Sequence, residues 1–320
     1  MRALIAGTRA SALALWQTEH AVATLRRAAH KRGLTLEFAL RKITTRGDTD
    51  QSPVLAGKLG KGFFTVELEA ALRAREIDFA VHSLKDLPTN AAEGLAIRAI
   101  LERGPAQDLL IVRPEAVREA GDQILPLVPG AKVGSSSLRR QALLARYAPK
   151  VSAEPLRGNV PTRLSKLGQG QYQAIVLAAA GVLRLELDLT PFAVFDLNPR
   201  VWIPAPGQGA VAIQCRDQDH ELEALLAVVN HGATADDTAL ERIYLQRLEG
   251  GCTTPFGCFA AATDLCLGLD AHGGWKRATA RRSAVGDAAG QAAIAALLDT
   301  MQTAGFRESA DQDWLYRPHR

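Results

Sequence analysis

The chain has few of the residues that cross-link a fold, span a bilayer or stack on bases. Four cysteines in 320 residues are too few for the disulfide framework of a small secreted domain. Aromatic residues make up only 5% of the chain, whereas proteins that bind single-stranded nucleic acid depend on them for stacking. No apolar run approaches the roughly 18 residues of a membrane-spanning helix. The sequence therefore predicts a cytoplasmic protein with reduced thiols and with no membrane or nucleic-acid partner.

The charges of the chain are nearly balanced and form no long block of one sign. The net charge is +4 and the sequence pI is about 9.0, whereas a general nucleic-acid coat is usually more lopsided. Cys252 and Cys258 are six residues apart with no histidine close behind, which disfavours a zinc site, and no metal is expected. The first residues lack the apolar core and cleavage site of a signal peptide. Any functional role of positive charge should therefore depend on local groups of basic residues and not on the net charge of the chain.

Segments of strand and helix period alternate along most of the chain. Strands are expected at 2–6, 35–43, 77–82, 108–112, 131–134, 151–155 and 174–178, and helices at 12–31, 63–76, 137–147, 159–167 and 231–248. Alternation of this kind predicts an α/β layer with a largely parallel sheet. We therefore expect two α/β lobes followed by a small α+β tail.

Two arginine-bearing loops lie in the middle of the chain, at 133–141 and 156–163. Each follows a short apolar run and opens a helical segment, so backbone N–H groups at a helix N-terminus favour an anion there. Arginines beside such a turn add planar donors that match carboxylate or phosphate groups. An isolated arginine is usually on a solvated helix face, but two loops combining Gly or Ser with paired arginines favour anion binding.

Further polar residues follow other predicted strands, namely Arg9, Lys85, Asp86 and Arg184. Ligands of open α/β sheets bind beyond the carboxyl ends of the strands, so we expect these residues near the ligand. Lys85 and Asp86 alone would more often be an ordinary surface ion pair. The glycine-rich loop 44–62, which holds Lys58 and Lys61, is interpreted as a lid that closes over an anion.

Cys252 follows a glycine pair on a predicted turn. A lone cysteine is normally a small buried hydrophobic residue, and Cys258 and Cys266 fit that description. The sequence around Cys252 instead indicates an exposed thiol.

At these residues the sequence resembles the porphobilinogen deaminase (hydroxymethylbilane synthase) family. The matching motifs, in the order of the family, are AGTRAS at 6–11, VHSLKDLP at 81–88, VGSSSLRRQ at 133–141, LRGNV at 156–160, TRL at 162–164, PGQGA at 206–210 and RLEGGC at 247–252. Each motif alone is weak, but together they are specific. The resemblance covers residues 1 to about 260.

The resemblance implies a transferase of tetrapyrrole (haem) biosynthesis. Such an enzyme joins four porphobilinogen molecules head to tail, releases ammonia at each step and yields hydroxymethylbilane. The chain grows on a dipyrromethane cofactor bound through a thioether to a cysteine, which by position here is Cys252. Every pyrrole carries an acetate and a propionate, so the growing chain is a polyanion. The resemblance also implies two lobes like those of periplasmic binding proteins, and a monomer.

Site residues carry over position by position. Those implied to bind the cofactor are Lys85, Ser137, Arg139, Arg140, Arg157 and Arg163, besides Cys252. Those implied to bind substrate or the growing chain are Arg9, Ser11, Arg157, Arg163, Arg184 and Gln208. Asp86 is implied to be the catalytic carboxylate, assisted by Arg9 and Lys85, because loss of ammonia leaves a cationic azafulvene that a carboxylate stabilises.

Pattern and resemblance together predict three domains. Residues 1–103 with 206–228 form the first α/β domain, on the substrate and lid side. Residues 104–205 form the second, with the carboxylate-binding loops, and 229–320 form an α+β domain that carries the cofactor cysteine. The chain departs from the family where relatives place a lysine at the position of Gly57, since here Lys58 is one residue later, while Lys61 still matches.

Two other classes of protein remain open from the residues alone. A non-catalytic module with two α/β lobes would also bind anions, but it leaves the Gly-Gly-Cys turn unexplained. Nucleic-acid binding through the arginine loops lacks the aromatic residues that single strands require. Incubation with porphobilinogen separates these hypotheses, because only the enzyme consumes it and releases ammonia.

Overall fold

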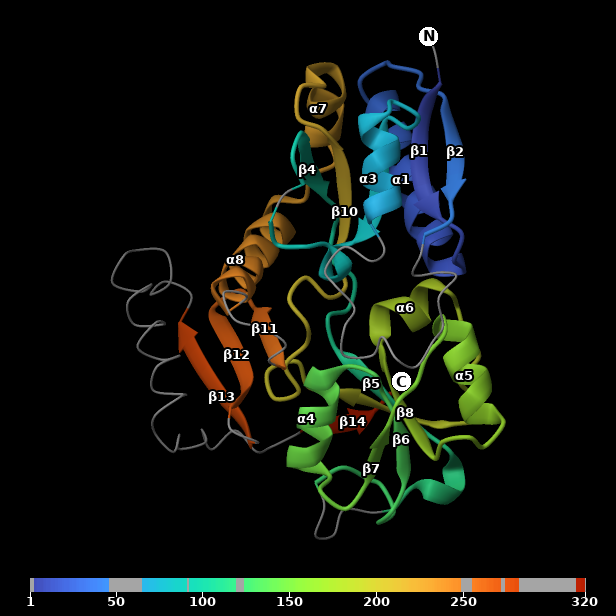
Figure 1. Ribbon diagram of the computed structural model, residues 1–320, viewed down its shortest axis with the longest axis vertical. Helices are drawn as coiled ribbons and strands as arrows, with labels where there is room; N and C mark the ends of the chain where they lie inside the picture. Colours follow the sequence, from blue (N-terminus) through green and yellow to red (C-terminus); the bar gives the residue numbers. More distant parts are fainter. Residues whose placement is uncertain are drawn as a thin grey trace. The chain divides into compact units, whose positions relative to one another are not determined.

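The computed structural model describes residues 3–45, 65–90, 92–118, 124–248, 255–271, 274–281 and 315–319 (Figure 1). The chain divides into two compact units. Unit 1 comprises Met1–Pro105 and Gly207–Gln246, and unit 2 comprises Ala106–Pro206 and Arg247–Arg320. Within the described residues, every helix is too short or too polar to cross a bilayer. The lid residues Lys58 and Lys61, and the cysteine Cys252, lie outside the described residues.

Unit 1 contains a five-stranded sheet in the order β2-β1-β3-β10-β4. The strands are β1 Leu4–Arg9, β2 Phe38–Ile43, β3 Phe79–Ser83, β4 Leu95–Ile100 and β10 Val211–Arg216. β1 runs parallel to β2 and β3, whereas β10 runs antiparallel to β3 and β4. The expectation of a largely parallel sheet is therefore wrong here, because β10 comes from a chain segment that returns to the sheet after an excursion of about 100 residues.

The described residues of unit 1 also form the α-helices α1 Ala12–His30, α3 Val66–Arg73, α7 His220–Ala227 and α8 Gly232–Leu248, the last extending two residues into unit 2. Helix α1 begins at Ser11, whose side chain accepts a hydrogen bond from the backbone N–H of Ala14. Its buried residues include Val22 and Leu25, which pack in the same apolar cluster as Phe79 of β3. Burial of this helical stripe holds α1 against the strands that end at the candidate site.

Unit 2 contains a six-stranded sheet in the order β14-β9-β5-β8-β6-β7. Its strands are β5 Asp108–Val112, β6 Lys132–Gly134, β7 Ser152–Glu154, β8 Ala174–Ala178, β9 Ala193–Leu197 and β14 Tyr316–Pro318. The α-helices among its described residues include α4 Leu138–Tyr147, α5 Val160–Gly168 and α6 Ala179–Arg184. β6 pairs in parallel with β7 and β8, whereas β5 runs antiparallel to β8 and β9. Both sheets are thus mixed, and the predicted α/β class is confirmed.

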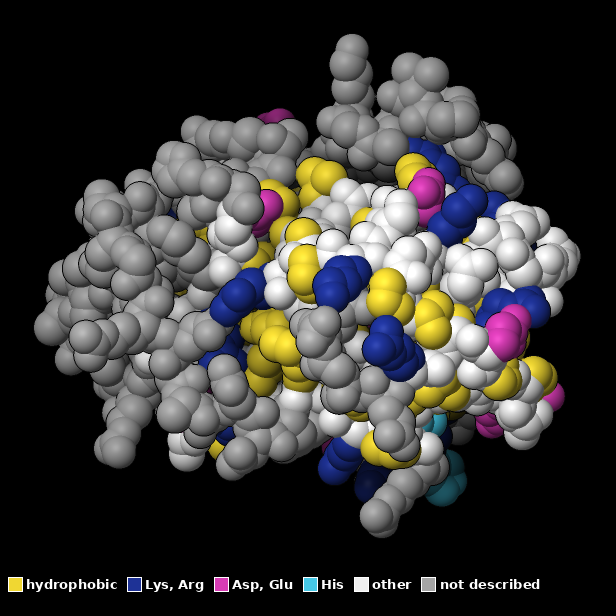
Figure 2. Space-filling model, turned by 90° about the horizontal axis from the view of Figure 1, so that it is seen from below, with side chains coloured by type: hydrophobic (Ala, Val, Ile, Leu, Met, Phe, Trp, Pro, Cys, Tyr) yellow, Lys and Arg dark blue, Asp and Glu magenta, His cyan; other side chains and the backbone are white. Residues whose placement is uncertain are grey.

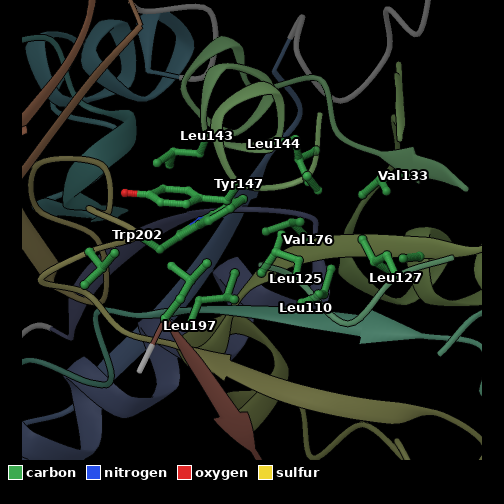
Figure 3. Close-up of a cluster of buried hydrophobic side chains, with 14 of the residues drawn as sticks. Leu110, Leu125, Leu127, Val133, Leu143, Leu144, Tyr147, Val176, Leu197 and Trp202 are labelled. Carbon is green, nitrogen blue, oxygen red and sulfur yellow. The ribbon is translucent and has the colours of Figure 1, made fainter. Parts of the chain in front are cut away.

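One face of the unit 2 sheet packs on the largest apolar cluster (Figure 3). Trp202 is fully buried and lies beside Tyr147 of α4, with 6.2 Å between ring centroids. The indole Nε1 of Trp202 donates a hydrogen bond to Oδ2 of Asp108 at 3.1 Å. This bond connects the apolar core of unit 2 to the carboxylate of Asp108, which begins β5.

A separate antiparallel sheet of unit 2 consists of β11 Phe256–Ala260, β12 Asp264–Ala271 and β13 Gly274–Arg281. Cys258 and Cys266 are buried in it, as packing residues. Burial raises the pKa of the Cys266 thiol above its ordinary value. The three predicted domains, with boundaries at 103, 206 and 229, stay a prediction.

Candidate functional site

In unit 1 the candidate residues lie at one edge of the sheet. Strands β1 and β3 are parallel neighbours that end at Arg9 and Ser83. Because Val211 pairs with Ser83, the antiparallel β10 begins at this same edge. The topology therefore brings together the residues after β1, the residues after β3 and the loop 206–210 before β10.

A single 3₁₀ turn, Leu84–Asp86, presents Lys85 and Asp86. Leu84 and Leu87 are buried on either side of these polar residues. The N–H of Leu84 donates to Ala210 O at 3.0 Å, which ties the turn to the start of β10. Asp86 is exposed, and its carboxylate accepts no hydrogen bond and makes no ion pair within the described part of the chain. The turn therefore offers a carboxylate to an external partner.

The loop 206–210, which carries Gln208, is held by a buried ion pair. Arg103 binds Glu241 of α8 through two N···O contacts of 2.8 and 3.1 Å. Glu241 also accepts the N–H of Gly207 at 2.6 Å, and Arg103 Nε donates to Gln208 O at 2.9 Å. Burying one partner of such a pair without the other would be strongly destabilising. The pair thus fixes the backbone on both sides of the Gln208 position.

Gly209 makes this path of the loop possible. Its φ is +88°, a region that favours glycine. A Cβ there would lie 2.5 Å from the carbonyl oxygen of Gly104. A side chain at this position would therefore separate the two backbone segments.

His82, near the end of β3, is buried and neutral at physiological pH. Burial lowers the pKa of its imidazole from 6.5 to about 4, and the positive charge of Arg9 adds to this effect. Its Nε2 lies 3.1 Å from Oε1 of Gln214, which can only accept, so the imidazole donates. The positive charge of this edge therefore comes from Arg9 and Lys85, which are both half-buried.

In unit 2 the two arginine loops and Arg184 follow three neighbouring parallel strands. The first loop follows β6, the second follows β7, and α6, which ends at Arg184, follows β8. Ser136 links the loops, because its Oγ donates to Leu156 O at 2.9 Å and accepts the N–H of Leu156 at 3.0 Å. The predicted gathering of the arginine loops at one sheet edge is therefore what the structure shows within this unit.

The arginines of the first loop are buried and bound to Asp108. Arg140 Nε and Nη2 donate to both oxygens of Asp108, at 3.1 and 2.7 Å, and Arg139 Nη2 donates to Oδ2 at 3.0 Å. Their Nη1 atoms donate to the carbonyls of Val176 and Ile203. Asp108 lies at this edge because it begins β5 opposite Ala178, the last residue of β8.

This buried cluster, which we call the Asp108 hub, contains two guanidinium groups and one carboxylate. Burial lowers the pKa of Arg139, the charge of Asp108 raises it, and the charge of Arg140 lowers it again. The hub therefore has an excess of positive charge at the N-terminus of α4, where the helix dipole adds to it. An additional anion would be stabilised beside it.

The second loop presents its arginines differently. Gly158 has φ of +111°, and a Cβ on it would lie 2.7 Å from the Thr162 side chain. Asn159 then caps α5 by accepting the N–H of Thr162 at 3.0 Å. Arg157 and Arg163 are only half-buried. The Nε of Arg163 donates to Gly158 O at 2.8 Å, and Arg157 makes no side-chain hydrogen bond or ion pair within the described ranges.

Three other predicted residues have identifiable local settings. Arg184 ends α6, and burial lowers the pKa of its guanidinium. The hydroxyl of Ser137 accepts the N–H of Arg140 at 3.5 Å, so it caps α4. Ser11 caps α1 in the same way. A capping hydroxyl keeps its own O–H to donate, so these roles are compatible with binding an anion.

Sequence reasoning missed Asp108, Arg103 and Glu241. Asp108 opens the buried run Asp108–Val112, and an acid beside a fully buried strand requires a cationic partner. That signal could have identified the hub. Nothing local marks Glu241, whose partner is 138 residues away.

The residues of unit 2 fit a ligand with several carboxylates. The observation that supports this fit is the excess positive charge of the Asp108 hub, beside half-buried Arg157, Arg163 and Arg184 at the same edge of the sheet. Planar guanidinium donors match carboxylates in geometry. No group of His, Cys, Asp and Glu within the described residues could hold a metal ion.

The chain is similar to known proteins over most of its length. The family model described as "Porphobilinogen deaminase, dipyromethane cofactor binding domain" matches residues 4–224. Porphobilinogen deaminases of Streptococcus sanguinis and Xanthomonas axonopodis are 42% and 46% identical, each over 81% of this chain and 82% of the relative. The enzyme of Deinococcus radiodurans is 42% identical over 86% of this chain and 85% of its own length. A solved periplasmic binding protein of Salmonella typhimurium with arginine specificity has a TM-score of 0.38 and 14% identity, covering 79% of this chain and 100% of that one.

Proposed function

The chain belongs to the porphobilinogen deaminase family, and from this premise we propose which of its residues carry the reaction. The enzyme condenses four porphobilinogen molecules head to tail, with release of ammonia, to hydroxymethylbilane, and its cofactor is dipyrromethane. We assign it to the transferases, because each step moves a pyrrolylmethyl group onto the end of a growing chain.

Asp86 is the catalytic carboxylate in this proposal. The observation that carries the assignment is the exposed Asp86 side chain on a turn anchored by two buried leucines. When ammonia leaves the substrate, positive charge develops on its ring. A preorganised carboxylate stabilises that charge and can hold the pyrrole N–H. Arg9 at the same sheet edge binds substrate carboxylates, with support from Ser11 and Gln208. Lys85 assists Asp86 and binds a carboxylate of the cofactor.

The cationic edge of unit 2 holds the acidic side groups of the cofactor and of the growing chain. Arg157, Arg163 and Arg184 provide half-buried guanidinium groups, and Arg139 and Arg140 provide the excess charge of the hub, with Ser137 as a hydroxyl donor. Cys252 is the proposed point of attachment of the cofactor, through a thioether. When bound, the dipyrromethane supplies the free pyrrole position at which chain growth begins.

A cytoplasmic, monomeric enzyme without nucleic-acid or membrane partners completes the proposal. On the face shown in Figure 2, Lys and Arg side chains form several separate groups among apolar and neutral ones.

Porphobilinogen consumption and ammonia release test the catalytic assignment. We expect Asp86→Ala to lower the rate about 100-fold or more, with the cofactor still present by intact-protein mass. The matched control is Asp217→Ala, which removes an exposed carboxylate elsewhere in unit 1 and should leave the rate unchanged. A near-normal rate for Asp86→Ala would overturn the assignment, and binding of porphobilinogen without ammonia release would favour a non-catalytic module.

A further inference from the structure

We propose that Arg242 of α8 is the positioning residue of the turn that carries Lys85 and Asp86. The inference rests on the proposed catalytic role of Asp86, and it adds a residue far away in the sequence that sets the direction of that carboxylate.

One guanidinium group of α8 binds three backbone carbonyls around this turn. Nη1 of Arg242 donates to Leu84 O at 3.5 Å and to Leu87 O at 3.2 Å, and Nη2 donates to Pro88 O at 2.6 Å. These carbonyls lie on both sides of Lys85 and Asp86. Arg242 therefore grips the backbone before and after the two polar residues.

Besides the bonds from Arg242, the described contacts of the turn include a bond from Leu84 N to Ala210 O at 3.0 Å and the burial of two leucines. A 3₁₀ turn of three residues is short, and its internal bond here runs from Leu87 N to Leu84 O at 3.2 Å. Leu84 and Leu87 are buried in one apolar cluster with Ala210, which precedes β10, and Ala235 of α8 packs against this cluster. Apolar burial is non-directional, whereas three hydrogen bonds from a planar group restrict rotation of the turn.

The shape of the arginine side chain matters for this role. Its planar guanidinium presents donors in fixed directions, so two nitrogen atoms can bind three oxygens that face the helix from one side. A lysine at 242 would retain the charge but supply a compact ammonium on a flexible stem. The neighbouring Glu241 holds the loop 206–210, so adjacent residues of α8 fix both segments that flank the sheet edge.

The test compares Arg242→Gln and Arg242→Lys in the holoenzyme. A displacement of about 1 Å at a catalytic group can lower a rate 100-fold, so we expect Arg242→Gln to lower kcat about 10- to 100-fold, with KM changed less than about twofold. Arg242→Lys should recover only part of the rate. The matched control is Arg73→Gln, because Arg73 also donates from two nitrogens to a backbone carbonyl, that of Glu93, in the same unit. It should leave kcat unchanged.

A double-mutant cycle with Asp86→Asn distinguishes positioning from general loss of structure. The readout is the single-turnover addition of the first porphobilinogen, followed by intact-protein mass. If Arg242 acts through Asp86, then Arg242→Gln should have little further effect once Asp86 is replaced. An equal loss in both backgrounds, or no loss in wild type, overturns the inference. Failure of the proposed function would appear separately, as a wild-type enzyme that adds no porphobilinogen.

Discussion

The two arginine loops of unit 2 look alike in sequence and differ in structure. Arg139 and Arg140 are buried and bound to Asp108, whereas Arg157 and Arg163 are half-buried beside the Gly158 turn. The first pair organises the sheet edge and leaves an excess of charge there. In the second loop, Arg163 donates through Nε to Gly158 O, whereas Arg157 makes no side-chain hydrogen bond or ion pair within the described ranges. An arginine in a motif of this kind can therefore stabilise the fold, remain available to a ligand, or do both. Whether a buried carboxylate already binds its guanidinium group distinguishes these cases.

Replacing Asp108 should have the largest effect on the stability of the first loop and therefore on its difference from the second loop. Asp108→Asn leaves two buried guanidinium groups without their carboxylate, and loss of one partner of a buried ion pair is destabilising by about 3–5 kcal/mol. Equilibrium unfolding in denaturant measures the change. Glu115→Gln, which disrupts the exposed pair with Arg113, should leave the unfolding midpoint unchanged. An Asp108→Asn variant with the unfolding midpoint of wild type would show that the Asp108 hub does not stabilise the fold.

Unit 1 also contains a buried ionisable group, His82, and its burial makes the free energy of unfolding depend on pH. Its pKa is about 4 in the fold and 6.5 in the unfolded chain, so between these values the unfolded state binds the extra proton. Its contribution to stability is therefore complete above about pH 6.5 and is lost as the pH falls towards 4, by about 3 kcal/mol in all. Unfolding at pH 7 and pH 4.5 should show a smaller decrease for His82→Gln than for wild type. Equal decreases would contradict a buried neutral imidazole.

Replacing one arginine in each loop sharpens the difference between them. Arg157→Gln should raise KM or lower cofactor loading about 10-fold, because a charged hydrogen bond to a ligand contributes about 1.5–3 kcal/mol, and its unfolding midpoint should stay near wild type. Arg139→Gln should lower the midpoint. Arg146→Gln, at an exposed position of α4, serves as the control for loss of charge. If Arg157→Gln proves as destabilising as Arg139→Gln, then the two loops do not differ as described.

The bond between the loops should have the smallest effect. Ser136→Ala removes both the donor to Leu156 O and the acceptor for its N–H, for a loss of about 1–2 kcal/mol in unfolding free energy. Ser165→Ala, on the exposed face of α5, should change it little. A Ser136→Ala variant as stable as wild type would show that the loops are held together by other contacts.

Several elements could be predicted from the sequence with the observed bounds. The strands at 108–112 and 174–178 are short apolar runs with polar neighbours, so pattern and structure agree. The helix expected at 159–167 is observed as α5 Val160–Gly168, with Asn159 as its cap and Pro161 in its first turn. Strand direction could not be predicted in the same way, because β10 joins its sheet from a distant segment. The period of hydrophobic residues indicates which side chains are buried, but it does not indicate whether a strand runs parallel or antiparallel to its neighbours.

The candidate site shows the same division. Motif residues such as Asp86 and Arg157 are candidates from the sequence because their neighbours in the chain are characteristic. Asp108 precedes Arg139 by 31 residues, and Arg242 follows Leu84 by 158. These pairings depend on which strands and helices become neighbours, so the supporting partners appear only once the chain is folded.

Intact-protein mass spectrometry tests the proposed enzyme most directly. The purified chain should carry the extra mass of a dipyrromethane, located on the peptide that contains Cys252. With limiting porphobilinogen, species larger by successive pyrrole units should appear. Cys252→Ala should abolish both additions, whereas Cys258→Ala, at a buried position of β11, should retain them. An active wild-type protein with unmodified Cys252 would contradict the covalent attachment on which the proposal depends.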